Sequence, residues 1–199
     1  MEINKDKYKL DSNNYHKKKS DKTQIVLSFS LRKDDYHIKR LQKKEFGQTK
    51  EWNTFTISRN GDIYQHFDPK YYSNYIGDKF GNKLAITITL ENMGSLVKLD
   101  NGTFINFLNE ECDEENVVEK NWIGFNYWEK ITNEQFNSVV ELCNMLCDDF
   151  DIPKTCIEFN HYHKDIKNFN GIAFKGNYII DCSDLNPTFN INKFSSKLK

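Results

Sequence analysis

The chain has 199 residues, of which 38% are hydrophobic and 14% aromatic, and these values exclude a disordered tail and indicate one globular domain with a substantial core. Its formal net charge of -1 excludes nucleic acid and an anionic membrane as partners attracted by bulk charge. No stretch approaches the roughly 18 apolar residues of a membrane span, and the charged first ten residues lack the apolar run of a signal peptide. We therefore expect synthesis in the cytoplasm without a signal peptide and without membrane insertion.

The first half of the chain predicts an arm, then strands and a helix. Residues 1–22 are polar and rich in Lys, Asp and Asn, so we expect a loose N-terminal arm before a domain that covers residues 23–199. Residues 24–30 and 84–90 are apolar or β-branched runs of strand length and predict buried central strands. Residues 34–50 carry many charges and predict a surface helix.

A β-hairpin is predicted between those two strands. Residues 52–57 alternate as a strand does, and residues 63–67 form the returning strand. Asn60 and Gly61 predict the tight turn that joins them, because this pair readily adopts positive φ. Residues 100–130 predict an irregular, solvated insertion with an acidic patch.

The clearest helix signal follows residue 130. Thr132 is a suitable N-cap, and Gln135 three residues later completes a capping box. Apolar residues then recur at helical spacing until Pro153 ends the segment, and they predict one buried stripe formed by Phe136, Val139, Val140, Cys143, Cys147 and Phe150. Strands that alternate with helices in one domain predict an α/β architecture.

The five cysteines are an odd number, and their spacing does not suggest a disulfide framework. Cys143 and Cys147 lie four residues apart in the helical pattern, which predicts core packing instead of ligand binding. Reduced thiols fit an intracellular site of synthesis.

Five segments carry a family resemblance through their order and spacing. They are residues 25–30, 57–72 (ISRNGDIYQHFDPKYY), 86–94 (ending LENMG), 127–132 (YWEKIT) and 171–189 (ending SDLNPTF). Across residues 23–194 the chain resembles the N-acetylmuramoyl-L-alanine amidase type 2 family, which shares its fold with peptidoglycan recognition proteins and amidase-class phage lysozymes. The resemblance implies a single α/β domain with a central mixed β-sheet flanked by helices.

The resemblance also implies a zinc hydrolase site, in which two His and one Asp or Cys hold the metal. Such a zinc ion polarises the amide carbonyl and lowers the pKa of its bound water. An acidic or Tyr group handles protons in the family, and a Lys or Thr beside the last ligand stabilises the oxyanion.

Most positions implied by the resemblance hold residues unsuited to that chemistry. The two His positions fall on Ser28, a poor zinc ligand, and on Lys175, whose ammonium repels a cation, while the third ligand position keeps Asp184. The helper positions fall on residues without the family's groups, namely Phe55, Thr89 and Cys182. The resemblance therefore implies a degenerate member without a zinc cofactor.

Alternatives remain open at these positions. Lys175 either pairs with Asp184 in the place of the metal, or both side chains point to solvent. His161 and His163 alternate, so on a strand they would face one side and form a relocated metal site with Cys182 or Asp184. The simpler interpretation is that both histidines are surface residues. Cys182 as a nucleophile lacks an evident base.

Three functional hypotheses follow. The first is a non-catalytic amidase-like domain that binds peptidoglycan or muropeptides through Tyr64, Tyr71, Tyr72 and Asn92, although Tyr71 and Tyr72 are equally suited to packing. The second is a structural or cargo component of a phage or phage-like particle, virion-associated or released, with other particle proteins as partners. The third is an active zinc amidase that cleaves the muramoyl–L-alanine amide with rearranged ligands.

Overall fold

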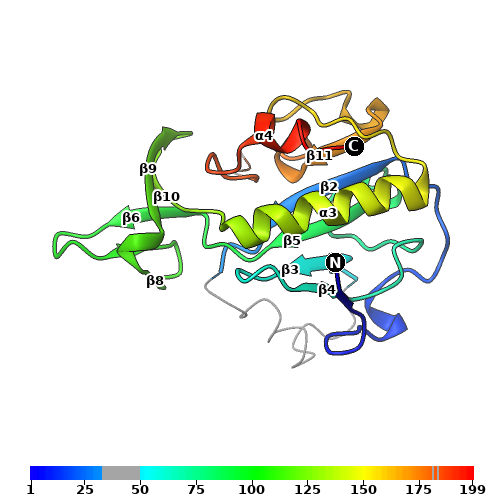
Figure 1. Cartoon of the computed structure of the whole chain (residues 1–199), viewed down its shortest axis with the longest axis horizontal. Coiled ribbons are helices and arrows are strands. Elements are labelled where there is room, and N and C mark those ends of the chain that lie inside the picture. The colour runs from blue at the N-terminus through cyan, green and yellow to red at the C-terminus, as the bar shows by residue number, and fades with distance from the viewer. Residues whose placement is uncertain (33–49, 181, 183) are drawn as a thin grey trace.

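The computed structural model describes residues 1–32, 50–180, 182 and 184–199, and its centre is a mixed β-sheet (Figure 1). The strand order is β1-β4-β3-β5-β2-β11, in which β3 and β4 pair antiparallel and the other neighbours pair parallel. The strands are β1 (Ile3–Asn4), β2 (Gln24–Phe29), β3 (Phe55–Ile57), β4 (Ile63–Gln65), β5 (Ala85–Leu90) and β11 (Gly171–Phe174). This architecture confirms the predicted single α/β domain, its two central strands and its hairpin.

The register of the sheet separates an apolar face from a polar face. Leu27, Ile88 and Phe55 are paired across β2, β5 and β3 and belong to the main core. The next row along the same strands consists of Ser28, Thr89 and Thr56. Because successive side chains of a strand point to opposite faces, the hydroxyl row lies on the face opposite the apolar row. This face is buried too, since the side chains of its hydroxyl row have no surface exposed to solvent.

Helix α3 (Asn133–Phe150) covers the apolar face of the sheet (Figure 1). Its predicted capping box is confirmed: the Gln135 backbone N–H donates to the Thr132 hydroxyl at 3.1 Å, and the Thr132 N–H donates to the Gln135 side chain at 3.3 Å. Cys143 and Cys147 lie in its buried stripe, as predicted. A satisfied cap and one apolar face explain why this helix was the easiest element to predict.

The predicted irregular insertion at residues 100–130 is wrong. Most of it belongs to a second, antiparallel sheet in the order β8-β7-β6-β10-β9, which extends to one side of the main sheet (Figure 1). Its strands are β6 (Ser95–Lys98), β7 (Phe104–Ile105), β8 (Glu111–Cys112), β9 (Val117–Trp122) and β10 (Phe125–Glu129). The strands are short and largely exposed, so they carry little of the alternation that identifies a strand in a sequence.

The N-terminal segment is packed and not loose as predicted. Strand β1 pairs with β4, and the Tyr8 ring lies edge-on to Tyr64 with centroids 4.8 Å apart. Leu10 is buried in a small cluster with Trp52 and Phe67. A few apolar side chains thus anchor a segment whose overall composition is polar. The division between arm and domain at residue 22 stays a prediction.

Short elements complete the fold. They are α2 (Gly81–Leu84), α4 (Ile191–Ser195), η1 (Ser12–Asn14), η2 (Glu114–Asn116), η3 (Ile166–Asn168) and η4 (Lys175–Asn177). The surface helix predicted for residues 34–50 falls, except for its last residue, outside the described residues. No helix in the described part of the chain is long and apolar enough to cross a membrane.

Lys22 is a buried cation that joins the N-terminal segment to the sheet. Its side chain is 7% exposed, and its Nζ donates to the carbonyl oxygens of Lys83 and Ala85, both at 3.0 Å. Burial lowers the pKa of Lys22 from 10.5 to about 7. Between about pH 7 and pH 10.5 the Lys22 amine is therefore protonated to a greater extent in the unfolded chain than in the folded chain.

We compare the free energies of unfolding of the wild type and of Lys22→Met as the pH is raised from about 7 to 10. We predict that the wild-type value minus the variant value increases with pH, with a limiting slope of about 1.4 kcal/mol per pH unit. Urea unfolding across this range measures the difference. Lys79→Met, at an exposed position, controls for the loss of a solvated lysine. A wild-type minus Lys22→Met difference that stays constant or falls with pH would contradict the prediction.

Candidate functional site

A cluster of three hydroxyl groups lies on the polar face of the main sheet. Ser28 on β2 and Thr89 on β5 are paired in register, and their side-chain oxygens are 3.1 Å apart. Tyr75, from the segment between β4 and α2, places its hydroxyl 2.9 Å from Ser28 Oγ and 2.8 Å from Thr89 Oγ1. Both strand residues are fully buried, so Tyr75 supplies the polar partner that their hydroxyls need.

Lys175 covers the other side of Tyr75. It directly follows β11, whose last residue Phe174 is paired with Leu27, so the next position lies beside Ser28. The Lys175 Nζ is 4.3 Å from the centroid of the Tyr75 ring, a cation–π contact. Burial alone would lower the pKa of Lys175. The nearby Tyr75, Asp184 and Cys182 raise this pKa by more than burial lowers it, so it lies above the ordinary value for lysine. Lys175 therefore remains an ammonium at neutral pH.

Asp184 is a buried carboxyl at the edge of this cluster. Its Oδ1 accepts from the Phe29 backbone N–H at 3.0 Å, and the Cys182 thiol donates to Oδ2 at 3.7 Å. Burial raises the pKa of Asp184, against the opposing effects of Lys175, the Phe29 N–H and Cys182. Burial also raises the pKa of Cys182 to about 11, so it is a thiol at neutral pH.

The predicted pairing of Lys175 with Asp184 is only partly realised. They lie close together in the interior, because the backbone N–H of Gly176, the residue after Lys175, donates to the Asp184 carbonyl oxygen at 2.9 Å. Within the described residues, however, no direct ion pair joins them, and the ammonium lies over the Tyr75 ring instead. Neither side chain points freely into solvent, since Asp184 is buried and Lys175 is half-buried.

The structure brings together most of the residues predicted for the degenerate site. Ser28, Thr89 and Lys175 contact Tyr75. Asp184 accepts from the N–H of Gly176, directly after Lys175, and the Cys182 thiol donates to Asp184. Phe55 does not join them, because the register places it in the apolar row of the opposite face.

Tyr75 was missed by the sequence analysis. It lies in a segment without strand or helix periodicity, and nothing in that segment marks it. The available signal was indirect: Ser28 and Thr89 are hydroxyl residues within two buried strands, and such groups need a hydrogen-bond partner from elsewhere in the chain.

The tyrosines predicted to bind a ligand are engaged within the protein. Tyr64 is 8% exposed, and burial together with nearby acidic groups raises its pKa to about 12. Tyr71 stacks on Tyr15 with centroids 5.7 Å apart, and Tyr72 stacks on His16 at 4.7 Å. These contacts favour the packing interpretation for Tyr71 and Tyr72, both of which keep partly exposed surfaces.

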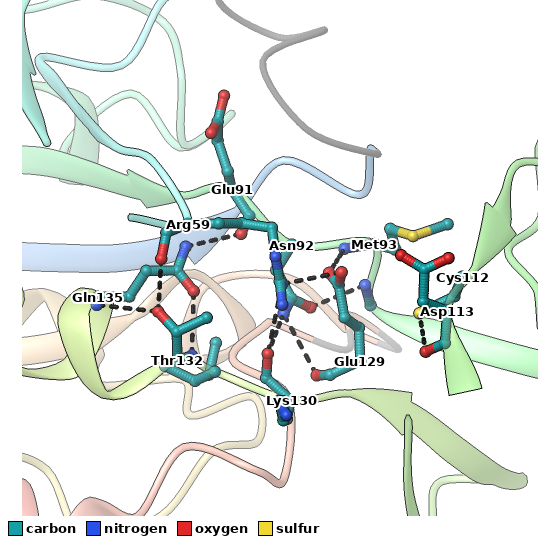
Figure 2. Close-up of polar contacts among 12 residues, drawn as sticks. Arg59, Glu91, Asn92, Met93, Cys112, Asp113, Glu129, Lys130, Thr132 and Gln135 are labelled. Atoms are coloured by element: carbon teal, nitrogen blue, oxygen red, sulfur yellow. Dashed lines mark hydrogen bonds and ion pairs between the residues drawn. The ribbon is translucent and has the colours of Figure 1, made fainter. Parts of the chain in front are cut away.

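Asn92 is a fully buried cross-link (Figure 2). Its Oδ1 accepts from the Gly94 N–H and from Asn186 Nδ2, both at 2.9 Å. Its Nδ2 donates to the carbonyl oxygens of Glu129 and Lys130 at 3.2 and 3.3 Å. The side-chain amide is thus used inside the protein and presents no surface to a ligand.

Glu129 extends the same network. Its carboxylate accepts from the Met93 N–H at 2.6 Å and lies 2.8 Å from Arg59 Nη1. Gln135 on α3 donates to the Glu91 carbonyl at 2.7 Å (Figure 2). The network therefore joins the end of β5, the second sheet and the start of α3.

His161 and His163 do not lie on a strand, contrary to the arrangement that a relocated metal site required. Both are exposed, and their rings lie 4.5 and 5.5 Å from the ring of Phe159. The described residues contain no group of three or more His, Cys, Asp or Glu side chains arranged to hold a metal.

The side chains in the hydroxyl cluster do not fit a catalytic zinc ion. Such a site uses three protein ligands and an open position. Here Asp184 is the one carboxylate among the described residues of the cluster, and its Oδ1 already accepts from the Phe29 N–H. The Lys175 ammonium adds a positive charge beside it, which opposes a divalent cation.

We predict that Tyr75→Phe lowers the free energy of unfolding by about 1–2 kcal/mol, because the Ser28 and Thr89 hydroxyls lose a shared buried partner while the ring is kept. Chemical denaturation measures the change. Tyr72→Phe is the matched control, since the Tyr72 hydroxyl makes no hydrogen bond within the described residues. Equal stabilities of the two variants would contradict the assigned role of Tyr75.

Comparisons with known proteins are consistent with this fold. A family model described as N-acetylmuramoyl-L-alanine amidase matches residues 14–172, whereas a search of curated proteins finds no match. The N-acetylmuramoyl-L-alanine amidase LysC from Clostridium intestinale URNW is 14% identical, with a TM-score of 0.56 over 100% of this chain and 97% of that one. A mutant endolysin from Bacillus subtilis is 12% identical, with a TM-score of 0.60 over 100% and 99%.

A third similar structure is the hydrolase AmiA from Staphylococcus aureus in complex with its ligand. It is 10% identical, with a TM-score of 0.54 over 92% of this chain and 73% of that one. At such identities the structural likeness shows the fold alone.

Proposed function

This chain belongs to the N-acetylmuramoyl-L-alanine amidase family, and on that premise we propose that it is a non-catalytic member that binds peptidoglycan. The observation that carries the proposal is the hydroxyl cluster of Ser28, Tyr75 and Thr89 with the Lys175 ammonium above it. By the family resemblance, Ser28 and Lys175 correspond to two metal-ligand positions and Thr89 to a helper position, whereas Tyr75 corresponds to none.

The chemistry of the cluster supports binding over hydrolysis. Amide hydrolysis needs an activated nucleophile and a group that stabilises the developing oxyanion. Ser28 is buried and hydrogen-bonded to its neighbours, and Cys182 is held as a thiol by its raised pKa. Lys175 supplies positive charge, but it lies against a ring within the protein. Recognition of a wall polymer needs shape and hydrogen bonds and no such nucleophile.

The amidases and the endolysin among the similar structures support peptidoglycan as the partner. The endolysin also favours a phage-related setting, in which the protein reaches the wall after release from the cell.

We predict that the purified full-length protein co-sediments with intact peptidoglycan sacculi, releases no peptide from muropeptides and contains far less than one zinc per chain. An active amidase assayed in parallel serves as the positive control, and cellulose serves as the control polymer. Elemental analysis measures zinc, and chromatography of the digests measures cleavage. Stoichiometric zinc together with chelator-sensitive peptide release would instead establish the active amidase, and an absence of sacculus binding would refute the binding role.

The positional assignment of the site has its own test. We predict that Ser28→His combined with Lys175→His and Tyr75→Ala raises the affinity for zinc, because two imidazoles then join Asp184 in a space from which the phenol has been removed. Lys175→Met, which removes the ammonium and adds no good zinc ligand, is the matched control. Zinc titration by calorimetry compares the two, and equal affinities would show that these positions do not correspond to metal-ligand positions.

A further inference from the structure

The acidic patch noted in the sequence belongs to the second sheet, which extends to one side of the main sheet (Figure 1). Strands β7 and β8 form a hairpin, and Phe107 in its turn is 67% exposed. Four exposed carboxylates follow it: Glu111, Asp113, Glu114 and Glu115. Residues 107–115 contain no lysine or arginine, and we call them the acidic tip. The tip therefore combines one exposed ring with concentrated negative charge.

Exposed apolar side chains gather on a different part of the surface. A hollow of about 520 Å³ is lined by residues 76–78, Tyr162 and residues 178–180. Ile180 on its wall is 65% exposed, and Tyr162 is exposed as well. Phe80, which is 60% exposed, adjoins the hollow because the next residue, Gly81, packs against the Tyr178 ring. We call the lining residues together with Phe80 the apolar hollow. Such a concentration of exposed apolar surface is typical of an interaction site.

Lysines surround the apolar hollow. The Lys167 Nζ lies 5.9 Å from the centroid of the Phe80 ring, and Lys79 directly precedes Phe80 in the chain. Lys164 lies two residues after Tyr162. All three lysines are exposed, so their ammonium groups can meet a partner's carboxylates at the edge of the hollow.

Carboxylates offset only part of this positive charge. Asp78 lines the hollow, but its Oδ1 accepts from the N–H groups of Phe80 and Gly81 at 2.9 and 2.7 Å. Asp165 is the one exposed carboxylate of the described residues 76–81, 162–167 and 178–180. With three lysines against these two carboxylates, the surface stays positive, whereas the acidic tip is negative.

The two surfaces lie at opposite ends of the parallel strands β2 and β5. The Tyr178 hydroxyl donates to the side chain of Gln24, the first residue of β2, and α2 leads directly into the start of β5. The second sheet follows the other end of β5 (Figure 1). One copy therefore cannot bring its acidic tip to its own apolar hollow, whereas two neighbouring copies can.

We propose that the acidic tip of one copy docks on the apolar hollow of a second copy. Phe107 supplies the apolar anchor, and the carboxylates around it meet the lysines around the hollow. Two hollows, or two tips, would bring like charges together, so the contact joins unlike surfaces. Each copy then keeps one free tip and one free hollow, and further copies add head to tail into open chains or rings.

The inference goes beyond the proposed function and does not depend on it. None of Ser28, Tyr75, Thr89, Lys175 and Asp184 lines the hollow. Self-association is measured without peptidoglycan, so its absence would leave sacculus binding unaffected. Conversely, a failure to bind sacculi would leave the head-to-tail contact in place.

Sedimentation velocity of the full-length protein at rising concentration tests the proposal. We expect the weight-average sedimentation coefficient of the wild type to increase past that of a dimer, and to fall when salt is raised from about 50 to about 500 mM. Phe107→Ser and Ile180→Ser should each weaken association about tenfold or more, because an apolar anchor is lost on one side. Val97→Ser is the matched control, since Val97 is 52% exposed on β6 outside both surfaces, and it should associate as the wild type does.

A mixture of the two variants distinguishes unlike from like surfaces. Phe107→Ser keeps its hollow and Ile180→Ser keeps its tip, so the mixture should form a one-to-one dimer that grows no further, although neither variant associates alone. A wild type that stays monomeric, a Phe107→Ser variant that associates as the wild type does, or a mixture without the dimer would each overturn the proposal.

A charge reversal covers the case in which a serine variant does not fold. Glu114 is exposed on η2, so Glu114→Lys leaves the core and Phe107 in place. We expect it to weaken association at low salt and to differ little from the wild type at high salt, where charges are screened. Unchanged association at low salt would contradict the assigned charge pairing.

Discussion

The buried contact between Asn92 and Glu129 is the constraint on which the rest of the structure depends. A buried carboxylate must be paired and hydrogen-bonded, and Glu129 meets this condition through Arg59 and the Met93 N–H. Asn92 then binds Asn186, which brings the C-terminal segment to the end of β5. Asp184 lies two residues before this contact, so the same network positions the edge of the hydroxyl cluster.

The hydroxyl cluster shows how a sheet that is buried on both faces accommodates a polar row. Ser28 and Thr89 cannot reach water, and each would cost about 1–3 kcal/mol if its hydroxyl were left unpaired. Tyr75 satisfies both and carries the Lys175 ammonium on its ring. Tyr75 therefore gives both strand hydroxyls a hydrogen-bond partner within the protein.

The sequence predicted those parts of the fold whose pattern is local. Strands β2 and β5 are continuous apolar or β-branched runs, and α3 has both a capping box and a helical stripe, so each could be located to within a few residues. The second sheet was missed because its short strands are half-exposed and lack clear alternation. Tyr75 was missed because its role arises from contacts between distant segments, which no local pattern encodes.

The second sheet has a small core of its own, formed by Met93, Leu96, Phe104 and Cys112, which is separate from the core beneath α3. Regions with few buried apolar contacts open at lower free energy than the rest of a domain. Its backbone amides should therefore exchange with solvent through a partial opening that leaves the main sheet closed. The amides of β9 and β10 should then exchange faster than those of β2 and β5, whose side chains belong to the main core.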